Sequence, residues 1–249
     1  MHKPLLIIQT GEAPDAIVER LGGFARWFRT SMRLRPEQMR TTRVDAGGKL
    51  PRPNQVAGAV ITGSSAMVTD RARWSEDTAA WIRTAMDAEL PLFGVCYGHQ
   101  LMAHALGGDV GWLPSDREIG TQAITRDGHG DALLDGMPAM FPAHTTHRQS
   151  VLAPPRGARV LARSQADPHQ ILRYAANAIS AQFHPEFGVR AMRAYLRERE
   201  DILDDEDFDV AQLRREVQPT PEARGLLRRF AVDALAAREH ADGPRRASR

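Results

Sequence analysis

The stretch "PLFGVCYGHQ" (residues 91–100) contains the only cysteine of the 249-residue chain, with a glycine two positions before it and another two positions after it. The apolar run before Cys96 predicts a buried strand, and the residues after it predict a short helix that ends near Gly107. A nucleophile at such a strand-to-helix turn requires small residues on both sides, because strand and helix approach each other closely. Gly94 and Gly98 meet this requirement, so the pattern favours a reactive thiol over a buried structural one.

The segments before this turn alternate between strand and helix patterns. Residues 4–9 form a continuous apolar run that predicts a strand buried on both faces, as in a parallel sheet. Shorter strands are expected within 41–47 and 58–68, and the second of these runs into a glycine-serine turn. The spacing of apolar residues predicts one or two helices over 13–34 and an amphipathic helix over 75–90, with its first serine as N-cap. This alternation indicates an α/β fold.

The second half of the chain has a different pattern. Residues 109–183 contain short β-like segments separated by proline, glycine and aspartate, which is typical of hairpins rather than of βαβ units. Residues 188–199 and 222–238 have helical spacing. Between these two helices, the acidic run over 198–209 is expected to be a solvated surface segment.

The pattern as a whole is interpreted as one domain over residues 1–240. Its core is expected to span about 4–190, followed by a helical extension over 188–240. Residues 241–249 have the composition of a disordered tail. The sequence contains no internal repeat and no low-complexity block, and its length is sufficient for a large α/β core.

Composition limits the classes of function. Lys and Arg number 33 and Asp and Glu number 31, which gives a formal net charge of +2 without a basic stripe, so no nucleic-acid partner is expected. A single cysteine cannot form an intramolecular disulfide, which favours a reducing compartment. The N-terminal apolar run is too short for a signal peptide or a membrane span. We therefore expect a cytoplasmic protein that does not bind a membrane.

A histidine at the end of the last expected strand is the best partner for the cysteine. In "AISAQFHPEF" (178–187) the apolar alternation ends at His184, and Glu186 follows two residues later. The proline between them ends the strand, and the spacing lets the carboxylate turn back toward the imidazole ring. A metal site made of Cys96 and these two groups lacks paired ligand spacing, so no metal is expected.

Other histidines are weaker candidates. His99 and His104 lie on the helix expected after the cysteine, and His104 should point away from the thiol. The "HTTH" cluster of His144 and His147 invites a metal interpretation but is expected to be a loop at the rim of the site. Four more histidines are expected at the surface: His2, His129, His169 and His240.

The two motifs together resemble those of a known enzyme family. "FGVCYGHQLMAHALGG" and "AQFHPEF" are similar to the G-x-C-x-G-H-Q elbow and the downstream H-P-E of the class I (triad) glutamine amidotransferases, over roughly residues 4–190. Within the family, the chain most resembles free-standing members related to the glutaminase domain of GMP synthetase. The resemblance implies a flavodoxin-like open, mostly parallel sheet flanked by helices, with a small antiparallel β extension. It also implies that Cys96 attacks glutamine, that His184 protonates the leaving ammonia, and that Glu186 orients the histidine.

The resemblance further assigns residues to substrate binding. Backbone N–H groups of Tyr97 and of the turn at Gly63 and Ser64 are implied to hold the developing oxyanion. Gln100 matches the family glutamine that contacts the amino-acid end of the substrate. The family often carries H-x-D-x-V, and the matching residues here are His147, Arg148, Gln149, Ser150 and Val151. Glutamine replaces the usual aspartate, which leaves open how the α-amino group is held and whether another γ-glutamyl compound is the substrate.

These assignments leave three functions open, each with a small-molecule ligand and no cofactor. The first is a glutaminase or amidotransferase that releases ammonia through a Cys96 thioester. Its possible partner is a separate ammonia-accepting synthetase, because no phosphate-binding glycine loop follows residue 190. The second is a γ-glutamyl peptidase that acts on glutathione-like compounds. The third is a non-catalytic subunit that regulates a synthetase.

Overall fold

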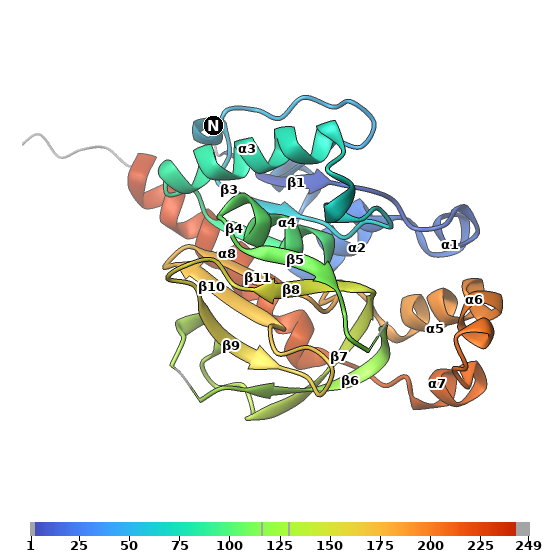
Figure 1. The fold of residues 1–249 in the computed structure, drawn as a ribbon. Helices are drawn as coiled ribbons and strands as arrows, with labels where there is room; N and C mark the ends of the chain where they lie inside the picture. The colour runs from blue at the N-terminus through green and yellow to red at the C-terminus, as the bar shows by residue number, and fades with distance from the viewer. Residues whose placement is uncertain (1–2, 116, 129, 243–249) are drawn as a thin grey trace, which may run out of the picture.

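Two sheets form the centre of the fold in the computed structural model, which describes residues 3–115, 117–128 and 130–242 (Figure 1). Among these residues, the larger sheet has nine strands in the spatial order β2 (Met39–Arg43), β1 (Leu5–Gln9), β3 (Gly58–Ile61), β4 (Leu92–Val95), β11 (Ala178–Ala181), β10 (Ile171–Ala175), β9 (Arg159–Arg163), β6 (Glu118–Arg126) and β7 (Met140–His147). The smaller sheet pairs β5 (Asp109–Trp112) with β8 (Gln149–Ala153).

The larger sheet is parallel from β2 to β11 and antiparallel from β11 to β7. Both faces of the parallel half are covered by helices, which explains its continuous apolar strands. The side chains of Leu5 and Ile7 belong to the core beneath α2 (Phe24–Met32) and α8 (Pro221–Asp242). Those of Leu6 and Ile8 belong to the core beneath α3 (Arg73–Asp87) and α4 (Tyr97–Ala105). The expected α/β class with a small antiparallel extension is confirmed.

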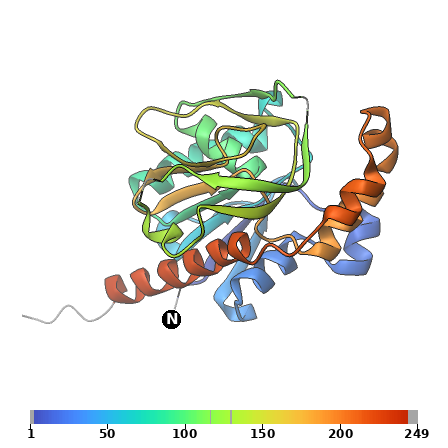
Figure 2. The ribbon, with the colours of Figure 1, turned by 90° about the horizontal axis from the view of Figure 1, so that it is seen from below.

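The remaining helices lie at one side of the sheet. They are α1 (Asp15–Leu21), α5 (Val189–Glu198), α6 (Glu200–Asp205) and α7 (Val210–Glu216). Figure 2 shows α5–α7 beside α1, and α5 contacts α1 directly. Short 3₁₀ turns complete the described chain: η1 (Pro36–Gln38), η2 (Pro53–Gln55), η3 (Val68–Asp70) and η4 (Ala132–Leu134). Within the described ranges, no helix combines the length and the apolar character needed to cross a bilayer.

The predicted N-cap of the helix over 75–90 is wrong. The helix expected from Ser75 begins at Arg73, and the Ser75 hydroxyl is buried and shares a hydrogen bond of 2.6 Å with the Tyr97 hydroxyl instead of capping the helix.

The acidic run over 198–209 lies largely at the surface, as expected, since Glu200, Asp201 and Asp204 are exposed. Within it, Leu203 is fully buried and Glu206 forms an ion pair with Arg117. The disordered tail is predicted over 241–249, but residues 241 and 242 are the last two of the C-terminal helix over 221–242, and 243–249 lie outside the described residues.

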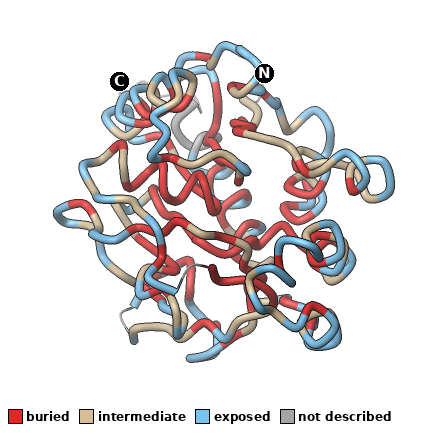
Figure 3. Tube along the Cα trace, turned by 45° about the vertical axis from the view of Figure 1, so that its right-hand side comes forward, coloured by how far each residue is buried: buried red, intermediate tan, exposed pale blue. Residues whose placement is uncertain are grey.

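The long C-terminal helix α8 packs against the strand that leads to the cysteine. Its Phe230 is buried and contacts Phe93 of β4 edge to face, with ring centroids 5.4 Å apart. Figure 3 shows the buried residues concentrated on the central sheet and on the helix faces turned toward it. The helix therefore forms part of the core that holds β4 in place.

We predict that Phe230→Ala lowers the free energy of unfolding by about 3–5 kcal/mol, because it leaves a cavity against Phe93. Val232 is a matched control on the same helix, since it is 58% exposed, and Val232→Ala should change stability by less than about 0.5 kcal/mol. Urea denaturation of both variants measures the difference. Equal losses would show that α8 does not support the core.

Candidate functional site

The turn between β4 and α4 holds Cys96 in a strained backbone conformation. Its φ is 52° and its ψ is −104°, and the residue is the N-cap of α4. The Cys96 N–H donates a hydrogen bond of 2.9 Å to the carbonyl of Ala181 in β11. A Cβ on Gly94 would lie 2.5 Å from the Gly98 carbonyl oxygen, and a Cβ on Gly98 would collide with the Ile61 backbone. The predicted need for two flanking glycines is confirmed.

His184 and Glu186 follow β11 and meet beside this turn. The Nδ1 atom of His184 is 2.8 Å from a carboxylate oxygen of Glu186, and both side chains are buried. The backbone N–H of His184 donates to the His144 carbonyl at 2.7 Å, and Phe187 stacks on the imidazole with centroids 4.2 Å apart. These contacts fix the ring plane and turn Nδ1 toward the carboxylate.

The opposite edge of the imidazole ring lies against Cys96. A Cβ built on Gly63 would be 2.9 Å from Cε1 of His184 and 3.6 Å from Cβ of Cys96, so both side chains border this glycine. The His184 Nε2 atom is buried and accepts or donates no hydrogen bond among the described nitrogen and oxygen atoms. The structure therefore brings Cys96, His184 and Glu186 together in one row.

The charges in this row favour a protonated histidine. Burial alone would lower the pKa of His184, but the Glu186 carboxylate and the Cys96 thiolate outweigh burial and raise this pKa to about 10. The imidazolium is then the stable form at neutral pH, and it places a positive charge beside the Cys96 sulfur atom. The N-terminus of α4 adds a second positive potential at the same sulfur atom.

The expected oxyanion turn follows β3 and is anchored by a threonine that the sequence interpretation missed. The Thr10 hydroxyl donates to the carbonyl of Thr62 or of Gly63, each 3.0 Å away, and the Thr10 N–H donates to the Thr62 hydroxyl at 3.1 Å. Tyr97 is the first residue of α4, where a backbone N–H has no partner within the helix. Its side chain points away from the thiol and packs on Trp74.

Two cavities meet at Cys96. One, of about 110 Å³, contains Gln100 and Gln149 in its wall, and the other, of about 160 Å³, contains His184. Both share a common wall formed by Ser64, Ser65, Cys96, Thr146 and Arg199. The thiol thus lies at the junction of a glutamine-lined cavity and a histidine-lined one.

The predicted substrate-binding residues divide into two groups. Gln100 donates to the Gln149 carbonyl at 2.7 Å, and both side chains line the smaller cavity. The Gln149 amide donates to Thr69 at 2.6 Å, whereas its Oε1 atom is buried with no partner among the described residues. Ser150 instead donates to Asp167 at 2.5 Å, and Val151 packs in a small core, so neither side chain lines the two cavities at the thiol.

The other histidines have structural partners. The "HTTH" residues are not a loop, because they form the end of β7, where His147 contacts Glu118 at 2.9 Å. Burial lowers the pKa of His99 to about 3 and that of His144 to about 4. His104 contacts Glu76 at 3.0 Å, as expected for a side chain turned away from the thiol. His169, expected at the surface, is half-buried against Val151. The surface predictions for His2 and His129 lie outside the described residues, as does the side chain of His240.

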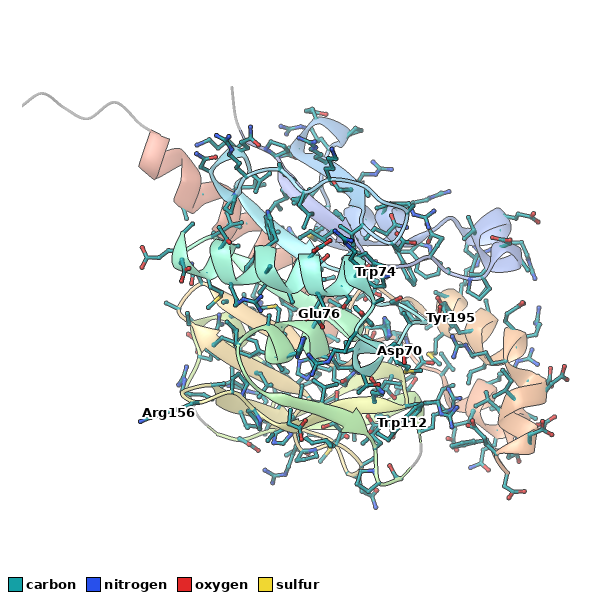
Figure 4. All side chains as sticks on the ribbon, turned by 45° about the horizontal axis from the view of Figure 1, so that its top comes forward. Asp70, Trp74, Glu76, Trp112, Arg156 and Tyr195 are labelled. Atoms are coloured by element: carbon teal, nitrogen blue, oxygen red, sulfur yellow. The ribbon has the colours of Figure 1, made fainter. Side chains whose placement is uncertain are left out.

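Three arginines and an aromatic residue at the cavities were not predicted. Arg117 and Arg148 line the smaller cavity, Tyr195 lines the larger one, and Arg199 lines both. Figure 4 labels Tyr195, which lies on the side of the molecule that carries α5–α7. Arg148 occupies a variable position of the H-x-D-x-V match, and no local pattern marks Arg117, Tyr195 or Arg199. In the described part of the chain, no group of three His, Cys, Asp or Glu side chains is placed to hold a metal ion.

Comparison with known proteins shows the class of protein that this fold and site define. The family of class-I glutamine amidotransferases matches residues 34–200, which is more than half of the chain. The chain therefore belongs to this family.

Its relatives include enzymes named for GMP synthesis. The chain is 33% identical over 184 residues to the glutamine-hydrolysing GMP synthase of Aeropyrum pernix, covering 72% of this chain and 34% of that protein. It is 35% identical over 106 residues to one subunit of the glutamine-hydrolysing GMP synthase of Methanocaldococcus jannaschii, covering 42% of this chain and 55% of that protein. The chain thus spans about a third of the length of the first relative.

A solved structure shares the fold at lower sequence identity. A glutamine amidotransferase from Thermotoga maritima superposes with a TM-score of 0.73 at 18% identity, covering 94% of this chain and 99% of that one. The arrangement of the sheet and helices is therefore that of solved glutamine amidotransferases.

We predict that Gly98→Ala lowers the free energy of unfolding by about 1–3 kcal/mol and displaces the thiol, because the added methyl group collides with the Ile61 backbone. Gly130→Ala is the matched control, since nothing lies within 4 Å of a Cβ at that position. Thermal unfolding and the rate of Cys96 alkylation by iodoacetamide measure the two effects. A Gly98→Ala protein with unchanged stability and alkylation would contradict the close approach of strand and helix.

Proposed function

We propose that the chain hydrolyses the side-chain amide of glutamine through a thioester on Cys96 and releases ammonia. The observation that carries the proposal is the row of Cys96, His184 and Glu186, in which a strained thiol borders an imidazole that is hydrogen-bonded to a buried carboxylate at 2.8 Å. A nucleophile, an acid-base group and an orienting carboxylate are the three parts that acyl transfer requires.

In the first step, the Cys96 thiolate attacks the γ-carbonyl carbon and a tetrahedral oxyanion forms. Backbone N–H groups of Tyr97 and of the turn at Gly63 and Ser64 hold this oxygen. The Tyr97 N–H is suited to this role because it belongs to the first turn of α4 and has no partner within the helix. As the carbon–nitrogen bond breaks, His184 transfers its Nε2 proton to the departing nitrogen. The products of this step are ammonia and a γ-glutamyl thioester.

In the second step, water attacks the thioester carbon. The neutral His184 takes a proton from this water, the carbon–sulfur bond breaks, and glutamate leaves with the thiolate restored. Glu186 keeps Nε2 directed at the reacting atoms in both steps by holding Nδ1. The buried Oε1 atom of Gln149 is an unpartnered acceptor, and we assign to it a hydrogen bond from the α-ammonium group of the substrate.

The wider setting of this activity is also proposed. A synthetase that accepts ammonia is the expected partner, because the relatives are named as a GMP synthase and as one subunit of such an enzyme. A free, reactive thiol favours a reducing compartment, and we place the protein in the cytoplasm. We treat residues 1–240 as one domain, since α8 packs on α2, β1, β3 and β7.

We predict that Cys96→Ala and His184→Gln abolish glutamate release from glutamine, because they remove the nucleophile and the proton carrier. The matched control is His104→Gln, which changes a histidine on the helix that follows the thiol but on the face that contacts Glu76. Labelling by a diazo-ketone analogue of glutamine, measured by mass spectrometry, should depend on Cys96. Absence of both hydrolysis and labelling in the unmodified protein would favour a non-catalytic subunit.

We predict that Glu186→Gln lowers kcat by about 10³–10⁴-fold, as loss of the orienting carboxylate does in comparable triads. It should also lower the pKa of His184 from about 10 by about 1–3 pH units, because burial remains while the negative charge is gone. The imidazolium then loses its proton at a lower pH than in the unmodified protein. Histidine NMR titration, with His184→Gln to assign the signal, measures this shift. An unchanged pKa of His184 in Glu186→Gln would show that the Glu186 carboxylate does not stabilise the imidazolium.

A further inference from the structure

The larger cavity at Cys96 lies on the side from which the amine departs. His184 delivers its proton to the leaving nitrogen, so that nitrogen must lie between the thiol and the imidazole. The cavity lined by Cys96 and His184 has a volume of about 160 Å³, whereas about 10–15 Å³ holds one molecule the size of water or ammonia. Its walls include Phe24 and Tyr195, which are apolar surfaces that ammonia does not need.

Arg199 provides a cation at this cavity. The residue is the C-cap of α5, is half-buried, and holds its guanidinium over the Tyr195 ring, 5.6 Å from the centroid. Among the described residues, no carboxylate oxygen lies within 4 Å of the Arg199 side-chain nitrogens, and no described acceptor bonds to them. Arginine keeps its charge when buried, so Arg199 presents a cation to the cavity. Glu206 and Cys96 act on this cation only at longer range, without an ion pair.

The acidic groups nearby are already occupied. Glu206 forms two hydrogen bonds with Arg117, at 2.5 and 3.0 Å, and lies 4.0 Å from Arg148. Arg148 in turn stacks on the Trp112 ring, which is labelled in Figure 4, at 5.1 Å.

The carboxylate of the larger cavity is occupied as well. Glu12 accepts hydrogen bonds from the side chain of Gln9 and from the backbone N–H groups of Ala13 and Phe24, at 2.6, 3.0 and 2.9 Å. It therefore fixes the start of α2 rather than neutralising Arg199. The wall that faces the departing amine therefore carries a guanidinium that forms no ion pair with a described carboxylate, beside the aromatic ring of Tyr195.

We propose that this cavity binds the amine part of a larger γ-glutamyl compound, in which the amine carries a carboxylate that Arg199 binds. The inference rests on the proposed function, because it concerns the substrate of the same thiol. The chemistry is unchanged: the thiolate forms the thioester, the carbon–nitrogen bond breaks, and His184 protonates the nitrogen of an amino acid instead of ammonia. Water then releases glutamate. The site is thereby suited to γ-glutamyl amino acids in addition to glutamine.

The test compares substrates that differ only in this carboxylate. The panel consists of γ-glutamyl amides of amino acids in which one, two or three methylenes separate the nitrogen from the carboxylate, each with its n-alkyl amide that lacks the carboxylate. In the unmodified protein, kcat/KM for at least one carboxylated substrate should exceed that of its alkyl amide by about tenfold to hundredfold, the range of a charge-assisted hydrogen bond. The preference should appear mainly in KM, since the carboxylate does not react.

Arg199→Gln should reduce this preference to about one, and Arg199→Lys should retain part of it because the charge remains without the planar fork. The matched control is Arg197→Gln, an exposed arginine on α5 that lines neither cavity at the thiol. Its preference should equal that of the unmodified protein. Circular dichroism and diazo-ketone labelling of Cys96 establish that each variant is folded with an intact thiol site.

The outcomes separate the inference from the function on which it rests. If glutamine is hydrolysed and Cys96 is labelled, but no carboxylated substrate is preferred, the inference is wrong and the proposed function stands. If Arg199→Gln slows carboxylated and alkyl substrates equally, the guanidinium acts on the thiolate or on the fold, and the inference is again wrong. If the unmodified protein hydrolyses no γ-glutamyl compound and Cys96 is not labelled, the proposed function fails and the inference fails with it.

Discussion

The close approach of α4 to β3 and β4 is the constraint on which the site depends. A non-glycine residue at positive φ costs about 1–3 kcal/mol and persists only when its surroundings hold it in place. Three backbone hydrogen bonds keep Cys96 in this conformation. Its N–H donates to the Ala181 carbonyl, the Gly98 N–H donates to the Thr62 carbonyl, and the Gln100 N–H donates to the Cys96 carbonyl. The first two attach the turn to neighbouring strands of the sheet. The strain is therefore opposed by the same parallel strands that form the core.

This attachment also sets the position of the acid-base pair. Ala181 ends β11, which lies next to β4, and the chain reaches His184 only three residues later. The order of the strands thus places the imidazole beside the thiol. Stacking by Phe187 and the hydrogen bond from the His184 N–H to the His144 carbonyl then restrict the orientation of the ring. Since the ring is already oriented, the charges of thiolate, imidazolium and carboxylate need little rearrangement as the reaction proceeds.

The sequence predicted those parts of the site whose residues lie close together in the chain. The glycines flanking Cys96 and the two-residue spacing of His184 and Glu186 are short patterns with a geometric meaning. The anchor at Thr10 could not be found in this way, because it acts on Thr62, which is 52 residues away.

The acidic segment over 198–209 also contains a long-range contact that its local sequence does not indicate. A charge run is usually a solvated face, and the pairing of Glu206 with Arg117 joins residues 89 positions apart. Ser150 shows another limit: a match to a family motif aligns the residues of a strand but does not show which side chains reach the substrate. Adjacent strand residues point to opposite faces, and the Ser150 hydroxyl bonds to Asp167. What could not be predicted is the part of the site that the tertiary fold brings together.

The charge balance at the cavities bears directly on which substrates the site accepts. Gln149 carries an amide, where the family often has aspartate, so the smaller cavity lacks that negative charge. Three arginines line the same cavity: Arg117 and Arg148 share the carboxylate of Glu206, and Arg199 forms no ion pair with a described carboxylate. The missing anion and the arginine cations both make the electrostatic potential of this cavity more positive. A more positive site favours carboxylates and disfavours ammonium groups. A substrate with more than one carboxylate matches this potential better than glutamine, whose single carboxylate is balanced by its own ammonium group.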